Sequence, residues 1–170
     1  MKTDENVYEL QNGKTLTFLY PAPKMELQPL NIGMIAAKYK EIFQLDEEAA
    51  LQMAKETKGY PFAFQALGYL CWKNKTKWTE ILPEYSQYLE EYVYEKLWSE
   101  LSSNDRKVLI AMVEAEDQKV SSIRAKAEKN SSSFGVYRDR LIKKGIIVAF
   151  EYGHLDFALP RFKEFVYRMK

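Results

Sequence analysis

The chain has 170 residues, which is enough for one domain or two small ones. Hydrophobic residues make up 46% of it and aromatic residues 14%, so it can bury a core. The low counts of seven glycines and six prolines argue against a disordered chain and against an all-β protein.

A single cysteine, Cys71, excludes an intramolecular disulfide and fits a reducing compartment. Its neighbours Leu70 and Trp72 predict a buried thiol. No run of about 18 apolar residues occurs, so we expect no membrane span and no membrane partner. Met-Lys-Thr-Asp-Glu at the start lacks the apolar core of a signal peptide, and we therefore expect a cytoplasmic protein.

Residues 1–30 are predicted to form a short β-hairpin or an extended arm. The β-prone runs Val7–Leu10 and Thr15–Tyr20 flank Asn12-Gly13, the strongest short hairpin signal. Prolines at positions 21, 23 and 29 then favour an extended chain.

Residues 31–100 have helical periodicity and are predicted to form a lid-like bundle. The expected inward stripes are Ile32, Ile35, Tyr39, Ile42 and Phe43, then Ala49, Leu51, Met53 and Ala54, then Phe62, Phe64, Leu67, Leu70 and Cys71. Lys58-Gly59 ends the second helix and Tyr60-Pro61 starts the third. The longest helix, Ile81–Leu101, is rich in tyrosine and is expected to continue into the next domain.

Residues 101–170 follow the order of a winged helix-turn-helix. Ser102 and Asp105 are spaced as a capping box, and any of Ser131, Ser132 or Ser133 can cap the third helix. Its expected inward residues are Phe134, Tyr137, Leu141 and Ile142. Gly145 suits a C-cap before a hairpin of Ile146–Glu151 and Leu155–Ala158, and Pro160 is expected to open a last helix that buries Phe162, Phe165, Val166 and Met169.

The net charge divides unevenly between these parts. Residues 103–170 hold 14 Lys/Arg and 9 Asp/Glu, whereas residues 1–102 hold 11 and 15. Between Lys119 and Lys144 there are eight basic and two acidic residues. The pattern indicates a basic module on an acidic body, although dedicated DNA-binding domains are usually more basic.

No catalytic constellation is recognisable. The single histidine, His154, lies at the predicted hairpin tip, without partners for a metal site or a Ser-His-Asp triad. Neither G-x-x-x-x-G-K-[ST] nor G-x-G-x-x-G occurs. Acidic pairs such as Glu90-Glu91 fit solvated helix faces. We expect no catalytic residue, no metal site, no cofactor and no enzymatic activity in this chain.

The third helix of the winged unit is the candidate site. The N-terminal part of such a helix enters the major groove of double-stranded DNA, where arginine reads guanine and lysine and serine hold phosphates. The candidate contacts, with the wing added, are Ser131, Ser132, Ser133, Arg138, Arg140, Lys143, Lys144, Tyr152 and His154. The same pattern fits a winged helix that docks a protein, in which case the acidic, tyrosine-rich helix Tyr85–Trp98 matters more.

Two segments together resemble the C-terminal region of P-loop ATPases of the STAND and AAA+ groups, including initiator-like members. Lys58-Gly59-Tyr60-Pro61-Phe62-Ala63-Phe64-Gln65-Ala66-Leu67-Gly68 resembles the Gly-x-Pro segment of the helical lid. Tyr137-Arg138-Asp139-Arg140-Leu141-Ile142-Lys143-Lys144-Gly145 resembles the winged helix that follows the lid, and Leu27–Leu30 is similar to the segment before it.

The resemblance implies a lid proline that touches adenine, which corresponds to Pro61, with Gly59 allowing the close approach. The Walker A and Walker B region is missing, so the resemblance implies that the chain is the C-terminal part of a longer ATPase, with ATP and Mg²⁺ bound only by that parent and its core as a possible partner. In this chain Pro61 is then expected to act as a helix-start proline. The expected fold is mainly α: an arm (1–30), a bundle (31–100) and a winged helix (101–170).

Overall fold

The structure is a computed structural model that describes residues 28–170. The hairpin or arm expected before residue 28 lies outside the described residues. The elements run in the order α1 (Ile32–Phe43), α2 (Glu47–Lys55), α3 (Pro61–Asn74), α4 (Trp78–Leu89), the π-helical η2 (Glu90–Tyr94), α5 (Glu95–Ser99), α6 (Ser103–Glu114), α7 (Val120–Lys126), α8 (Ser131–Lys143), β1 (Ile147–Glu151), β2 (His154–Phe157) and α9 (Phe162–Arg168).

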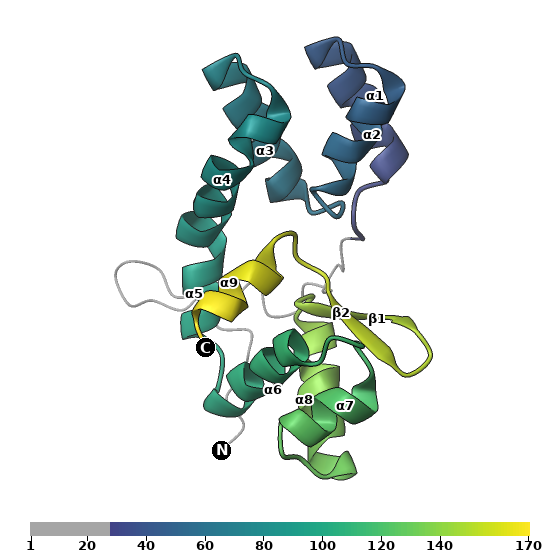
Figure 1. Cartoon of the computed structure of the whole chain (residues 1–170), viewed down its shortest axis with the longest axis vertical. Coiled ribbons are helices and arrows are strands. Elements are labelled where there is room, and N and C mark those ends of the chain that lie inside the picture. Colours follow the sequence, from purple (N-terminus) through teal and green to yellow (C-terminus); the bar gives the residue numbers. More distant parts are fainter. Residues whose placement is uncertain (1–27) are drawn as a thin grey trace, which may run out of the picture.

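The predicted fold class is confirmed: the chain is mainly helical, with a small antiparallel sheet near its C-terminus. Figure 1 shows α1–α4 at one end, the winged helix of α6–α8 and the hairpin at the other, and α9 between them. Within residues 28–170, no helix combines the length and the apolar character that crossing a membrane requires.

Local sequence signals position the bundle helices. The side chains of Asn31 and Asp46 cap α1 and α2, and Pro61 occupies the first turn of α3. Tyr39 packs its ring on Phe64 and donates its hydroxyl to the Phe64 carbonyl at 2.7 Å, which fixes α1 against α3. These caps and contacts fix the helix starts and the packing of α1 on α3.

Two inward positions predicted in this bundle were wrong. The side chain of Ile42 is 57% exposed, because Ile35 and Tyr39 already fill the buried stripe of α1. Leu51 is also exposed, because Ala50, Met53 and Ala54 form the buried stripe of α2. In each helix the other predicted inward residues are buried or half-buried, and one position falls outside the stripe.

The long helix predicted over Ile81–Leu101 is a continuous helical segment of α4, η2 and α5. Its buried residues are Ile81, Tyr85, Leu89, Tyr94 and Trp98. They are four positions apart, except for the step of five between Leu89 and Tyr94. That step falls in η2, where the Glu95 N–H reaches the Glu90 carbonyl as in a π-turn. The π-turn therefore brings Tyr94 and Trp98 onto the buried side.

Aromatic packing joins the bundle to the winged helix. The Tyr94 ring lies 4.9 Å from the ring of Phe162 and 5.8 Å from that of Phe165, and Trp98 meets Phe165 edge-on at 5.9 Å. The buried Tyr94 hydroxyl donates to the carbonyl of Pro160. Burial raises the pKa of Tyr94 well above its ordinary value, so the hydroxyl stays protonated as a donor.

The winged helix is built as its sequence order predicts. Ser102 and Asp105 form the expected capping box of α6. β1 and β2 pair antiparallel, with Ile147 opposite Phe157. A backbone bridge from Lys119 to His154 places the segment before α7 against β2 as a third, very short strand. This arrangement holds α7, α8 and the hairpin as one unit.

Three expectations in the winged helix need correction. The last helix begins at Phe162, two residues after Pro160, because Arg161 adopts a left-handed conformation (φ 55°) and caps the helix start. Met169 follows the helix end and is 45% exposed. Ile142 is 38% exposed, because Phe134 and Leu141 occupy the buried side of α8.

Gly59 joins the bundle to the segment that precedes it. Its φ is +74°, and its carbonyl accepts a hydrogen bond from the Leu30 N–H at 2.8 Å. A Cβ at this position would lie 2.6 Å from the Leu30 carbonyl oxygen. Glycine is required here both by the backbone conformation and by the close approach of residues 29–30.

We expect Gly59→Ala to lower the free energy of unfolding by about 3 kcal/mol or more, because strain and a backbone clash combine. Gly145→Ala is the matched control: its φ is +68°, but apart from its chain neighbours no described atom lies within 4 Å of the added Cβ. That variant should lose only about 1 kcal/mol. Urea unfolding followed by circular dichroism measures both, and equal losses would contradict the role given to Leu30.

Candidate nucleic-acid interface

The three serines predicted as caps of α8 have separate environments. Asn130 is the actual cap, since its side chain accepts from the Ser133 N–H at 2.8 Å. The Ser133 hydroxyl also bonds to Asn130, and the Ser131 hydroxyl accepts from Arg124. Ser132 is exposed, and among residues 28–170 its hydroxyl has no hydrogen-bond partner. Of the three, Ser132 is the hydroxyl most open to a ligand.

Arg140 is engaged by other residues of the winged helix, although its side chain remains 40% exposed. Its guanidinium donates twice to Asp105 Oδ1, through Nε at 3.1 Å and Nη2 at 2.5 Å, and once to the Ser102 hydroxyl at 3.3 Å. The Asp105 side chain is only 4% exposed. Arg140 therefore supports the capping box of α6 and fixes α8 against α6, so its guanidinium is largely occupied within the protein.

Arg138 is paired on the surface. Its Nε and Nη2 donate to Asp139 Oδ1 at 3.0 and 2.8 Å. Both side chains remain partly exposed, so the pair contributes little to stability, and donors of Arg138 remain available to a ligand. Asp139 places a carboxylate on the outer face of α8, which disfavours phosphate nearby and can accept from the amino group of cytosine.

Lys143 and Lys144 are exposed at the C-terminal end of α8. No acidic side chain of the described part of the chain forms a salt bridge with either of them. Their ammonium groups are thus open to an external anion. They are the candidate residues whose environment agrees best with the sequence prediction.

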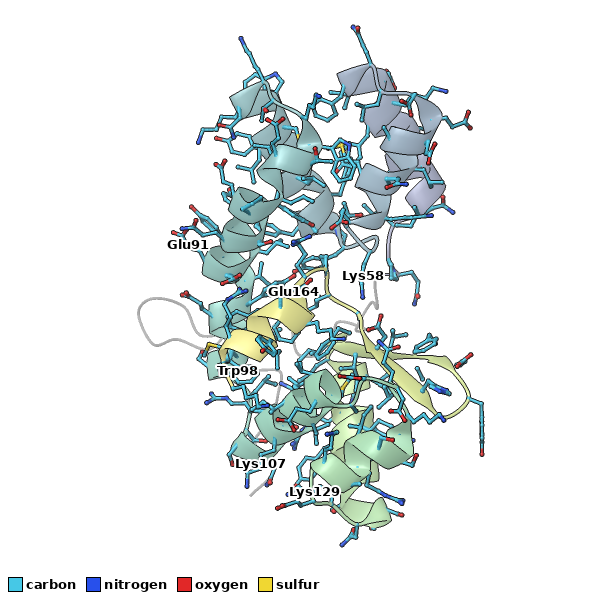
Figure 2. All side chains as sticks on the ribbon, viewed as in Figure 1. Lys58, Glu91, Trp98, Lys107, Lys129 and Glu164 are labelled. Atoms are coloured by element: carbon cyan, nitrogen blue, oxygen red, sulfur yellow. The ribbon has the colours of Figure 1, made fainter. Side chains whose placement is uncertain are left out.

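Further basic residues lie beside the N-terminal end of α8. Arg124, in α7, donates to Ser131, and Lys129, in the turn, donates to Asn104 and lies over the ring of Tyr137. Figure 2 shows Lys129 and Lys107 at the same end of the winged helix. The count of basic residues in the sequence included these residues but did not predict their position. The turn between α7 and α8 places Arg124 and Lys129 beside the start of α8.

The wing is more apolar than a DNA-binding wing of basic residues would be. Tyr152 is fully exposed at its tip, and Val148 and Phe150 are exposed along β1. His154, predicted at the tip, lies instead in β2, where its Nδ1 is 3.0 Å from Glu151 and 3.1 Å from the Tyr152 carbonyl oxygen. Tyr152 is therefore the accessible candidate in the wing, and His154 is engaged within the hairpin.

The two positions that the resemblance relates to a nucleotide lie in and beside the loop between α2 and α3, on the side of the bundle that faces the hairpin. Pro61 is exposed in the first turn of α3, and Gly59 is buried against Leu30. Each residue has a local structural role: Pro61 starts α3, and Gly59 allows the close approach of Leu30.

A cleft of about 310 Å³ separates the bundle from β2 and α9. Lys58 donates to Asp156 at 3.0 Å and to the Phe157 carbonyl at 2.6 Å, and Arg161 pairs with Glu56 at 3.0 Å. These central charges neutralise one another across the cleft. Within residues 28–170, histidine, cysteine and acidic side chains do not gather in a metal-binding group of three.

Cys71 is buried, as its apolar neighbours predict. Burial raises the pKa of the Cys71 thiol to about 11, so the thiol is protonated near neutral pH and poorly nucleophilic. Near α7, hydrogen bonds from the Ser122 hydroxyl and the Lys119 N–H lower the pKa of Asp117. Asp117 therefore stays ionised and orders the turn before α7.

Comparison with known proteins gives one match. A family model described as a domain of unknown function, DUF8462, matches residues 91–166, from η2 into α9. No curated protein and no solved structure matches the chain. The matched span includes α8, the wing and the aromatic contacts of Tyr94 with α9.

We expect Arg140→Ala to reduce the free energy of unfolding by about 2 kcal/mol, because it leaves the buried Asp105 carboxylate without its charged partner. For a chain of this length the loss corresponds to a fall in Tm of about 4–8 °C. Arg138→Ala, which breaks an exposed pair, should change stability by less than about 0.5 kcal/mol. Similar melting temperatures for the two variants would show that the Arg140 contacts are not stabilising.

Proposed function

We propose that this chain is the lid and winged-helix region of a P-loop ATPase of the STAND or AAA+ type, and that its winged helix binds double-stranded DNA. The observation that carries the proposal is the environment of α8. Its outer face is open to solvent and ends in Lys143 and Lys144, whose charges have no acidic partner among the described residues, and the hairpin stands beside it.

The physical argument concerns phosphate. Lysines without intramolecular partners attract the DNA backbone and release its counterions, which makes the affinity depend on salt. Ser132 adds a hydroxyl near the helix start, and Arg138 keeps donors beside Asp139 for phosphate or a base edge. The exposed Tyr152 ring extends the surface to the neighbouring groove.

The ATPase part of the proposal is supported by the order of the elements. A helical bundle that begins with a Gly-Tyr-Pro helix start is followed by a winged helix, as the resemblance implies. ATP and Mg²⁺ would be bound by the core of such an ATPase, to which this chain contributes Pro61 at most. We assign no hydrolysis to this chain, and we place the protein in the cytoplasm because of its single, buried cysteine.

The double variant Lys143→Ala/Lys144→Ala should weaken the binding of a mixed-sequence duplex and make it less dependent on salt. For each lysine that loses a phosphate contact, the slope of log K against log salt should fall by about 0.9. Fluorescence anisotropy at several salt concentrations measures the slope.

Lys73→Ala/Lys77→Ala, at the α3–α4 end of the bundle, removes the same charge far from α8 and should leave the slope unchanged. An equal fall for both double variants would indicate attraction by net charge alone and would contradict the assignment to α8.

A second function, docking of a partner protein, is favoured by the outer face of α4 and η2. Tyr92 is 58% exposed, its ring lies 4.4 Å from that of Tyr88, and Tyr88 stacks on Phe62 at 6.0 Å. Figure 2 shows Glu91 on the outer side of the same segment. Exposed aromatic rings beside carboxylates are typical of protein contacts and are unsuited to phosphate.

If this face binds a protein, Tyr92→Ala should abolish the co-purification of that protein from cells while the affinity for duplex DNA stays unchanged. Tyr69→Ala, which removes another exposed tyrosine on α3, is the control and should retain the partner. Co-purification that withstands Tyr92→Ala would exclude this face.

A further inference from the structure

No contact within the described part of the chain explains why position 135 is a glycine. It lies inside α8 in a right-handed helical conformation, where glycine is less stable than alanine. Apart from its chain neighbours and the adjacent backbone of α8, a Cβ added there would meet no atom of residues 28–170 within 4 Å. By contrast, Cβ atoms at Gly59 and Gly68 would meet the Leu30 carbonyl and the ring of Tyr39.

The position of Gly135 is the part of α8 that a duplex would meet. It is the fifth residue of the helix, one turn after Ser131 and Ser132 and one turn before Asp139. Its neighbour Val136 is 62% exposed, which leaves an apolar side chain in the same open region. The N-terminal half of this helix is the half that enters the major groove in helix-turn-helix proteins.

We infer that Gly135 is the point at which the backbone of α8 comes closest to bound DNA, and that Val136 beside it contacts thymine methyl groups. The inference rests on the proposed DNA binding. A side chain at position 135 would hold the helix away from the groove, and an apolar side chain is suited to the C5 methyl group of thymine. The absence of a side chain at position 135 thus serves DNA binding, although glycine makes α8 less stable than alanine would.

The test uses Gly135→Ala and an A·T-rich duplex of about 20 base pairs, long enough for a helix-turn-helix site. The variant should raise Tm by about 2–4 °C, because alanine is the better helix former and has room. The same variant should weaken binding about tenfold, the effect of one lost base contact. Gly68→Ala, the same substitution in α3, should leave the affinity unchanged.

The second measurement replaces every thymine of that duplex by uracil, which removes only the methyl groups. The wild-type protein should bind the uracil duplex about fourfold more weakly, the effect of one buried methyl group. Val136→Ala should bind both duplexes equally. Equal binding of both duplexes by the wild-type protein would overturn the role of Val136.

Two results would overturn the role of Gly135. One is an unchanged affinity of Gly135→Ala for the duplex. The other is a lower Tm of this variant, which would show that there is no room for a side chain at position 135. In either case the proposed function would stand as long as the wild-type protein binds the duplex. Absence of wild-type binding at any salt concentration would overturn the proposed DNA binding and this inference together.

Discussion

The packing of Tyr94 and Trp98 on α9 is the contact on which the rest of the structure depends. These two side chains belong to the helix that leaves the bundle, whereas Phe162 and Phe165 belong to the last helix of the winged unit. Rings at about 5–6 Å in tilted and edge-on arrangements contribute beyond the area they bury. Since the core is continuous across this joint, the bundle and the winged helix share one hydrophobic cluster.

Polar contacts also hold the bundle to the hairpin and α9 beside that joint. Arg161 reaches Glu56, and Lys58 reaches the end of β2, so the loop between α2 and α3 is fixed to the hairpin. Gly59 lies in the same loop and holds residues 29–30. These polar contacts hold the loop between α2 and α3 against the hairpin and α9, beside the aromatic joint.

Much of the fold could be predicted from the sequence because the signals are local. Ser102 with Asp105, and Pro61, act within one helical turn, and they have the predicted roles. The candidate site was harder, because the role of a charged side chain depends on distant partners. Arg140 meets Asp105 across 35 positions, and no periodicity indicates such a pair. Lys143 and Lys144, which need no partner, were predicted correctly as exposed.

The five-residue step between Leu89 and Tyr94 has a consequence for the shape of the molecule. An α-helix turns by about 100° per residue, so the wider turn of η2 takes up the additional residue and keeps Tyr94 and Trp98 in phase with Leu89. If η2 became α-helical with no residue removed, the aromatic stripe after it would turn by about 100° away from α9, whereas deletion of one residue there would keep the stripe in place. The contact between the bundle and the winged helix therefore depends on the conformation of one turn, η2.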